Sequence, residues 1–433
     1  MTAGGRPPTD LDADMSSAAG ERGDPAVVRR ARAWLSRAAE PGSVAAWRFV
    51  EDAGPVAAVL ALRAGRAPAA VQALVGVRAE QDASLADLRR AERCGGRLVV
   101  PEDEEWPRSA LHALTVAAVS EDPGSPDQSD RTTALVPPVA LWVRGPARLA
   151  DVVERSVAVV GARASTAYGE HVAGDLAHRL GESGWAVVSG GAYGIDAAAH
   201  RGALAAGGST VAVLACGVDR VYPSGNGALL ERIADEGLVL SEWPPGAAPH
   251  RHRFLVRNRL IAALTRGTVV VEAAARSGAQ ATARRARRLG RPVMAVPGPV
   301  TSAMSVGCHE LIRDQESGAV LVGTAAHVIE EVGRLGEDLA PPPEVPVDVR
   351  DELSDLARRV LDACPVRRGV GPERLAVVAG CSVVEVLQQL PALEVAGLVE
   401  FRGTGWRLAP APRPHRRGGP AAGADRLRAG EAG

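Results

Sequence analysis

Glycine and serine residues are concentrated in two segments of this 433-residue chain that are suited to bind phosphate. One segment reads Ser189-Gly190-Gly191-Ala192-Tyr193-Gly194 and the other reads Arg276-Ser277-Gly278, and each precedes a stretch with helical periodicity. The free N–H groups and the positive dipole end at the start of a helix attract anions. Glycine in a single turn of this kind would be explained by turn geometry alone. Two such turns, with Ser189 and Ser277 beside them, favour an anion site.

The basic residues of the chain are all arginine, because the sequence contains no lysine. A Walker A phosphate loop and a pyridoxal Schiff base both need a lysine, so both classes of protein are excluded. The formal net charge is −1, but the segment Trp243–Val300 holds eleven arginines and a single acid, Glu272, which gives it a local charge of +10. This charge indicates a polyanionic ligand, or acidic partners elsewhere in the fold or in a dimer.

Aromatic side chains accompany these polar and basic residues. The chain has three tyrosines, Tyr168, Tyr193 and Tyr222, and all lie in or beside segments that follow predicted strands. Phe254 lies at the start of a helical stretch that carries Arg257-Asn258-Arg259. Phosphate contacts combined with aromatic rings for base stacking are typical of proteins that bind single-stranded nucleic acid. Any one of these rings taken alone is better explained as a filler of the core.

Two other ligand chemistries fit the sequence less well. The first turn lacks the G-x-G-x-x-G pattern of dinucleotide sites, and the second predicted strand ends in Ser189 where a ribose-binding acid would be expected. A hydrolase triad of Ser189, Asp196 and His200 lacks the G-x-S-x-G elbow around its serine. Asp196 and His200 are four residues apart on one predicted helix. We therefore expect a mutual hydrogen bond between them that fixes the glycine loop.

No metal or cofactor is predicted for this chain. His250-x-His252 and Cys308-His309 resemble fragments of metal sites but lack partners at ligand spacing. The five cysteines are far apart and form no C-x-x-C pair, which argues against a disulfide scaffold. There is no N-terminal signal segment and no apolar run approaching about 18 residues. We therefore expect a cytoplasmic protein without a membrane span.

Short apolar segments alternate with longer helical stretches between residues 98 and 335. Continuous apolarity suits strands that are buried on both faces, and the intervening helices suit right-handed crossovers. We predict an α/β fold with a Rossmann-like, doubly wound parallel sheet, in which ligands bind at the carboxyl ends of the strands. The predicted strands are Val157–Val160, Ala186–Ser189, Thr210–Leu214, Leu238–Ser241, Thr268–Glu272 and Val293–Val296.

Composition divides the rest of the chain into smaller parts. Short helical periods over residues 26–95 predict a small helical (SAM-like) domain ahead of the 98–335 core. Residues 1–25 and 409–433 lack periodicity and are rich in glycine and proline, so we expect disordered tails there. Residues 336–348 contain a proline-rich run and are predicted to be a linker.

Residues 349–408 form a separate predicted domain. Three helical periods are followed by two short apolar segments that flank Gly403-Thr404-Gly405, a pattern typical of a winged helix. The helix that would enter a DNA major groove, Ser382–Ala396, contains Glu385 and Glu394 but no arginine. Because major-groove helices normally present Arg, Lys, Asn or Gln to DNA, we favour a protein-contact or structural role for this domain.

The core also carries a series of motifs in a specific order. In chain order they are Val160-Gly161-Ala162-Arg163 with Ser165 and Tyr168-Gly169, Ser189-Gly190-Gly191-Ala192-Tyr193-Gly194-Ile195-Asp196 with His200, Tyr222-Pro223, Ser241-Glu242, Phe254, Arg257-Asn258-Arg259-Leu260-Ile261, Val271-Glu272-Ala273, Ser277-Gly278, Thr282-Ala283, Pro297-Gly298, and Gly307 ahead of Leu311-Ile312. Together they resemble the DNA-processing protein A family (DprA, also called Smf). Leu255 departs from the family pattern, which usually has proline after the phenylalanine.

The resemblance implies a non-catalytic role. Members of the family bind single-stranded DNA in a Rossmann-like domain, form homodimers, and load the RecA recombinase onto incoming strands during natural transformation. The arginine of the first family motif corresponds to Arg163. The basic helix after the fourth predicted strand corresponds to Arg257 and Arg259, with Phe254 at its start.

Residue chemistry and resemblance together define a predicted site. The predicted nucleic-acid-binding residues are Arg163, Ser165, Tyr168, Ser189, Gly190, Gly191, Tyr193, Gly194, Phe254, Arg257, Asn258, Arg259, Ser277 and Gly278. Asp196, His200 and Glu272 are expected to support the site structurally. The alternative function is that of a Rossmann-like nucleotide-monophosphate phosphoribohydrolase, in which Glu242 and Glu272 would be catalytic.

Overall fold

The structure is a computed structural model that describes residues 11, 15, 24–120, 135–314, 318–334, 336–338, 353–403 and 405–410. The predicted tails and the predicted linker lie largely outside these residues. The chain divides into two compact units, Met1–Pro341 and Pro342–Gly433.

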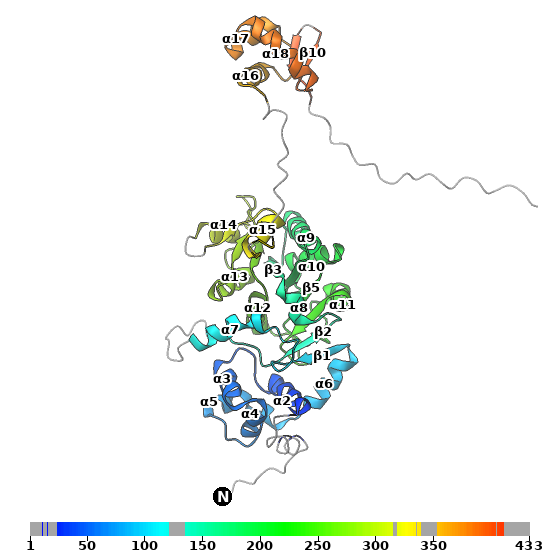
Figure 1. Cartoon of the computed structure of the whole chain (residues 1–433), viewed down its shortest axis with the longest axis vertical. Helices are drawn as coiled ribbons and strands as arrows, with labels where there is room; N and C mark the ends of the chain where they lie inside the picture. Colours follow the sequence, from blue (N-terminus) through cyan, green and yellow to red (C-terminus); the bar gives the residue numbers. More distant parts are fainter. Residues whose placement is uncertain are drawn as a thin grey trace, which may run out of the picture. The chain divides into compact units, whose positions relative to one another are not determined.

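A nine-stranded sheet forms the centre of the first unit (Figure 1). The strand order is β1-β2-β6-β5-β4-β3-β7-β8-β9, and the strands from β3 to β9 pair in parallel. The order reverses between β3 and β7, which confirms the predicted doubly wound, Rossmann-like arrangement. The predicted strands correspond to β3 (Ser156–Gly161), β4 (Ala186–Ser189), β5 (Thr210–Leu214), β6 (Leu238–Ser241), β7 (Thr268–Val271) and β8 (Val293–Ala295).

Three further strands were not predicted. β1 (Gly96–Val99) and β2 (Leu141–Arg144) pair antiparallel with each other, and β2 pairs antiparallel with β6. β9 (Val320–Leu321) extends the opposite edge of the sheet in parallel with β8. The sheet is therefore mixed at one edge and not parallel throughout.

Helices cover both faces of the sheet, as the continuous apolarity of the strands requires. Val157 and Val159 of β3 pack toward α9 (Ala167–Glu182), α10 (Ile195–Ala205) and α15 (Ala325–Val332). Ala158 and Val160 of the same strand pack toward α7 (Arg108–Ser120), α12 (Arg251–Ala263) and α13 (Gly278–Arg288). The remaining helices of this part are α8 (Leu149–Glu154), α11 (Gly227–Glu236) and α14 (Val306–Arg313), with the short 3₁₀ helix η3 (Ser224–Asn226).

The N-terminal part of the first unit is helical, as predicted, and is drawn in blue in Figure 1. Trp34, Leu35, Val50 and Leu62 are among the side chains that form its own apolar core. The SAM-like assignment stays a prediction. The helices are α2 (Pro25–Ala38), α3 (Val44–Ala53), α4 (Pro55–Arg63), α5 (Ala69–Val75), η1 (Gly76–Glu80) and α6 (Ser84–Arg93).

The second unit contains three helices followed by a β-hairpin. Ser382 and Glu385 form a capping box at the start of α18, which explains why this helix begins where the sequence predicts. The winged-helix assignment stays a prediction. The elements are α16 (Asp355–Ala363), α17 (Pro372–Ala379), α18 (Val383–Val395), β10 (Val399–Arg402) and β11 (Gly405–Leu408).

Within the described part of the chain, no single helix has the length and apolar character of a membrane span. One bent pair, α17 with α18, meets that criterion by length and composition only.

Candidate nucleic-acid interface

A cavity of about 320 Å³ opens beside the carboxyl ends of β3 and β7. This is the point at which the strand order reverses, where open α/β sheets bind their ligands. The cavity collects residues that are far apart in the sequence. Its polar and glycine lining consists of Gly161, Arg163, Asp196, Arg257, Asn258, Ser277, Gly278 and Thr282.

The start of α13 forms one wall of this cavity. The Ser277 hydroxyl accepts a hydrogen bond from the Gln280 amide at 3.4 Å and so caps the helix. A Cβ added to Gly278 would meet no atom within 4 Å, so the backbone is open at this point. An anion can therefore approach the N-terminus of α13, as the glycine-serine pattern predicts.

Arg257 is a buried cation that lines the same cavity. One guanidinium nitrogen donates to the Val213 carbonyl, while the buried Nε has no partner. Burial lowers the pKa of Arg257 to about 10, although nearby Asp196 opposes this shift. The guanidinium is thus a charged group in a poorly solvated position, with Asp196 as a nearby counter-charge, and it faces a cavity that a phosphate can enter.

The glycine loop after β4 leaves space for Arg257. A Cβ on Gly190 would lie 2.2 Å from a terminal nitrogen of the Arg257 guanidinium. Gly194 has φ +73°, and a Cβ there would lie 2.4 Å from the Ala162 carbonyl. The sequence predicts that Gly190 admits a ligand backbone. The structure instead has the Arg257 side chain in that space.

Asp196 fixes this loop, but not through the expected bond to His200. Its carboxylate accepts from the Gly190 amide at 3.1 Å and from the Ala192 amide at 3.4 Å. His200 Nδ1 instead lies 2.8 Å from the Thr210 hydroxyl. The prediction of an Asp196–His200 hydrogen bond is therefore wrong, because the histidine side chain is directed toward β5.

Arg259 does not face the cavity, in contrast to its prediction as a nucleic-acid contact. Its guanidinium lies 2.8 and 2.9 Å from the two carboxylate oxygens of Glu242, and the two side chains are 1% and 3% exposed. Arg257 and Arg259 are two residues apart, which places them on different sides of α12. Arg259 is thus a structural ion pair in this conformation. Asn258 lines the cavity and donates to the Gly278 carbonyl at 3.4 Å.

An arginine and two aromatic rings form a cluster beside the cavity. The Arg163 guanidinium carbon is 5.1 Å from the centre of the Phe254 ring, and that ring is 5.6 Å from the ring of Tyr222. Arg163 also lines the cavity, so it connects these two rings to the wall that the start of α13 forms. We define Arg163, Phe254 and Tyr222 as the stacking platform.

Several of the predicted nucleic-acid-binding residues lie outside both the cavity and the stacking platform. Tyr168 donates to the Pro297 carbonyl at 2.6 Å, and the Tyr193 hydroxyl accepts from the Gly225 amide at 3.1 Å. The Ser165 hydroxyl donates to Glu170 at 2.7 Å. Ser189 is fully buried and donates to the Val159 carbonyl, so it cannot reach a ligand. Gly191 is also buried, against Leu230.

Comparison with known proteins shows the family of this chain. Residues 116–333 match the model of the family described as DNA recombination-mediator protein A. The DNA processing protein DprA of Mycobacterium tuberculosis is 49% identical over 379 residues, which span 88% of this chain and 94% of the relative. This chain belongs to the DprA/Smf family.

Other family members match over shorter stretches. Protein Smf of Escherichia coli is 35% identical over 281 residues, covering 60% of this chain and 69% of that protein. The crystal structure of DprA from Streptococcus pneumoniae superposes with a TM-score of 0.53 at 30% identity, over 75% of this chain and 99% of that one.

Two acidic residues of this DprA/Smf chain are engaged internally. Glu272 has a φ of +54° and accepts from the Thr166 amide at 2.8 Å and from its hydroxyl at 2.5 Å. It thus supports the start of α9, in agreement with a structural role. Burial raises the pKa of Glu242, and Arg259 lies against it. The phosphoribohydrolase alternative would require these carboxylates to line the cavity, but neither of them does.

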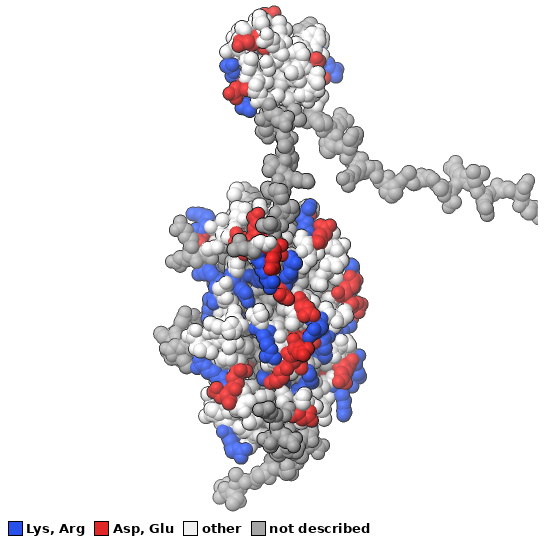
Figure 2. Space-filling model, in the orientation of Figure 1, with Lys and Arg blue, Asp and Glu red and all other residues white. Residues whose placement is uncertain are grey.

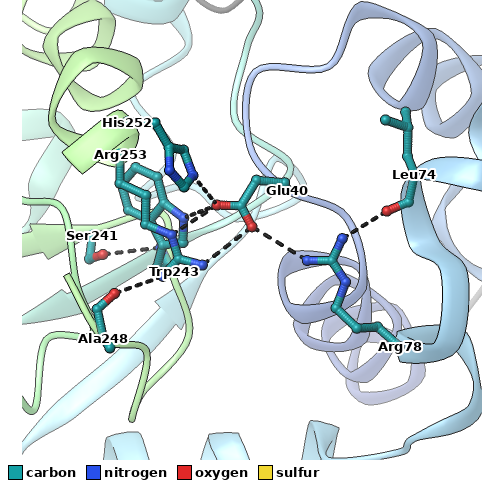
Figure 3. A network of polar contacts seen from close by, with 8 residues as sticks. All are labelled: Glu40, Leu74, Arg78, Ser241, Trp243, Ala248, His252 and Arg253. Carbon is teal, nitrogen blue, oxygen red and sulfur yellow. Dashed lines mark hydrogen bonds and ion pairs between the residues drawn. The ribbon is translucent and has the colours of Figure 1, made fainter. Parts of the chain in front are cut away.

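The start of α12 is tied to the N-terminal helices by a network that the sequence did not reveal (Figure 3). Glu40 accepts from Arg253 Nε at 2.8 Å and from Trp243 Nε1 at 3.2 Å, and it lies 3.3 Å from His252 and 3.4 Å from Arg78. Burial alone would raise the pKa of Glu40, but the bonds and charge of Arg253 hold it below its usual value. Phe254 directly follows Arg253, so the network positions the stacking platform.

Proposed function

We propose that this chain is a non-catalytic protein that binds single-stranded DNA and mediates recombination. The observation that carries the proposal is the cavity at the reversal of strand order, with Arg163 and Arg257 in its lining and the stacking platform beside it. Arginine and helix N–H groups hold phosphates without reading sequence, and aromatic rings stack on any base. Membership of the DprA/Smf family supports the same function.

The test is fluorescence anisotropy of labelled oligo-dT with the full-length protein, beside a matched duplex. We expect tight single-strand binding, weaker duplex binding and a log–log salt slope of about −0.7 per neutralised phosphate. Arg163→Ala should weaken binding with an unchanged melting temperature. Arg232→Ala, which removes an exposed arginine of α11 paired with Glu236, is the matched control. Unchanged affinity in both Arg163→Ala and Arg257→Ala would refute the proposed site.

We further propose that the chain acts as a homodimer in the cytoplasm and loads RecA onto single strands. The family resemblance supports this part of the proposal. Light scattering would give the oligomeric state. RecA filament formation on oligo-dT covered by single-strand-binding protein, with and without this chain, tests the loading step, and an unchanged rate would refute it.

The enzymatic alternative is tested separately. Incubation with nucleoside monophosphates followed by chromatography of the products should release no free base. Base release that is lost in Glu272→Gln would favour the phosphoribohydrolase.

A further inference from the structure

The outer face of α13 carries a stripe of exposed arginines. Arg284, Arg287 and Arg288 are exposed, while Ala279, Thr282, Ala283 and Ala286 are buried on the opposite side of the helix. Positions separated by three and four residues share one side of a helix. The three side chains therefore form one surface, which we call the α13 stripe.

The sequence around the α13 stripe is rich in arginine and poor in acidic residues. No aspartate or glutamate occurs in residues 273–300. The carboxylate of Asp314 lies 4.0 Å from Arg287, and both side chains are about half exposed, at 53% and 46%. Exposed pairs of this kind contribute little stability and leave the arginine available. Basic side chains accordingly gather over α13 in Figure 2.

The stripe is continuous with the proposed DNA site. Ser277, Gly278, Ala279 and Thr282, from the first turns of α13, line the cavity, and the exposed Arg276 immediately precedes them. A single-stranded DNA that leaves the cavity over the start of α13 reaches the outer face of the same helix. Arg284 and Arg288 are about 6 Å apart along the helix axis, which is close to the distance between successive phosphates of a single strand. The stripe is thus long enough to contact more than one phosphate.

We propose that the α13 stripe is a second contact for the backbone of single-stranded DNA, which lengthens the bound segment beyond the cavity. This inference rests on the proposed function. Arginine contacts to phosphate carry no sequence information, so the stripe adds affinity for long strands without changing base preference. A partner protein with an acidic surface is the competing occupant.

The experiment compares oligonucleotides of two lengths. The variant Arg284→Gln/Arg287→Gln/Arg288→Gln removes the stripe, and Arg179→Gln/Arg201→Gln/Arg232→Gln removes the same charge from exposed positions on α9, α10 and α11. Both full-length proteins are titrated with labelled dT6 and dT30 at several salt concentrations, after circular dichroism has shown that they are folded.

We expect the stripe variant to bind dT6 like the wild type and to bind dT30 more weakly. Its salt slope for dT30 should be shallower by about 2, since three phosphate contacts at about 0.7 each are lost. An unchanged dT30 slope, or an equal change in the control, would overturn the inference and favour an acidic protein partner. Failure of the wild type to bind either oligonucleotide would instead refute the proposed function itself.

Discussion

The ion pair between Arg259 and Glu242 offers a direct way to separate structural arginines from those that contact DNA. Arg259→Met would leave Glu242 as a buried charge without a partner, since the two side chains are 1% and 3% exposed. Breaking a buried pair in this way costs about 3–5 kcal/mol. Burial already raises the pKa of Glu242, so protonation can relieve part of this cost and the lower end of the range is expected.

The assay is thermal unfolding followed by oligo-dT anisotropy. At about 2–4 °C per kcal/mol for a domain of this size, a cost of about 3 kcal/mol should lower the melting temperature of Arg259→Met by about 6–12 °C. The double variant Arg259→Met/Glu242→Leu removes both charges and keeps similar volumes. Such replacements are often neutral or stabilising, so the double variant should recover the wild-type melting temperature and bind oligo-dT with wild-type affinity.

Two results would refute this reasoning. A double variant that melts like the wild type but no longer binds oligo-dT would show that Arg259 contacts DNA. A single variant Arg259→Met with an unchanged melting temperature would show that Glu242 does not depend on its partner.

Three further predictions concern residues that position or surround the site: Glu40, Gly190 and His200. Glu40→Gln should weaken oligo-dT binding about two- to fivefold, as expected for a partly exposed network worth about 0.5–1 kcal/mol. The control Glu51→Gln, on the exposed side of α3, should leave binding unchanged. Equal affinities of the two variants would contradict the positioning role of Glu40. Gly190→Ala should displace the Arg257 guanidinium and reduce affinity, and retained affinity would argue against Arg257 as a contact. Burial lowers the pKa of His200 to about 3 from 6.5, so unfolding takes up a proton below pH 6.5. Stability should therefore fall by about 1.4 kcal/mol per pH unit from 6.5 toward 3. The free energy of unfolding, measured with urea at pH 7 and pH 5.5, should decrease less in His200→Asn than in the wild type. An identical decrease in both proteins would contradict the low pKa of His200.

The sequence predicted the parallel strands because each is a continuous apolar segment that is buried on both faces. It did not predict β1 and β2, which are four residues long and contain Arg97 and Arg144. Each depends on an antiparallel partner more than forty residues away, and no local pattern records such a pairing. β9 has two exposed residues and no apolar period to detect.

Parts of the site were predictable because they have a local sequence pattern, as the buried strands do. Ser277 and Gly278 can be placed by local rules, because helix starts have their own sequence signature. Arg257 and Arg259 cannot be distinguished locally, because the side of α12 that faces the cavity is decided by the sheet and by Glu242. Glu40 is more than 200 residues from Arg253 in the sequence, so only the fold shows that they meet.

The distribution of the arginines bears on whether the ligand is a nucleotide or a polymer. In the segment with a local charge of +10, Arg259 is neutralised by Glu242 and Arg253 by Glu40. Arg257 remains charged in the cavity wall, and the α13 stripe remains exposed outside it. A mononucleotide in a cavity of about 320 Å³ would need only Arg257 and not the α13 stripe. A cationic surface that continues beyond the cavity suits a ligand that also extends beyond it, and this favours a nucleic-acid strand over a small nucleotide.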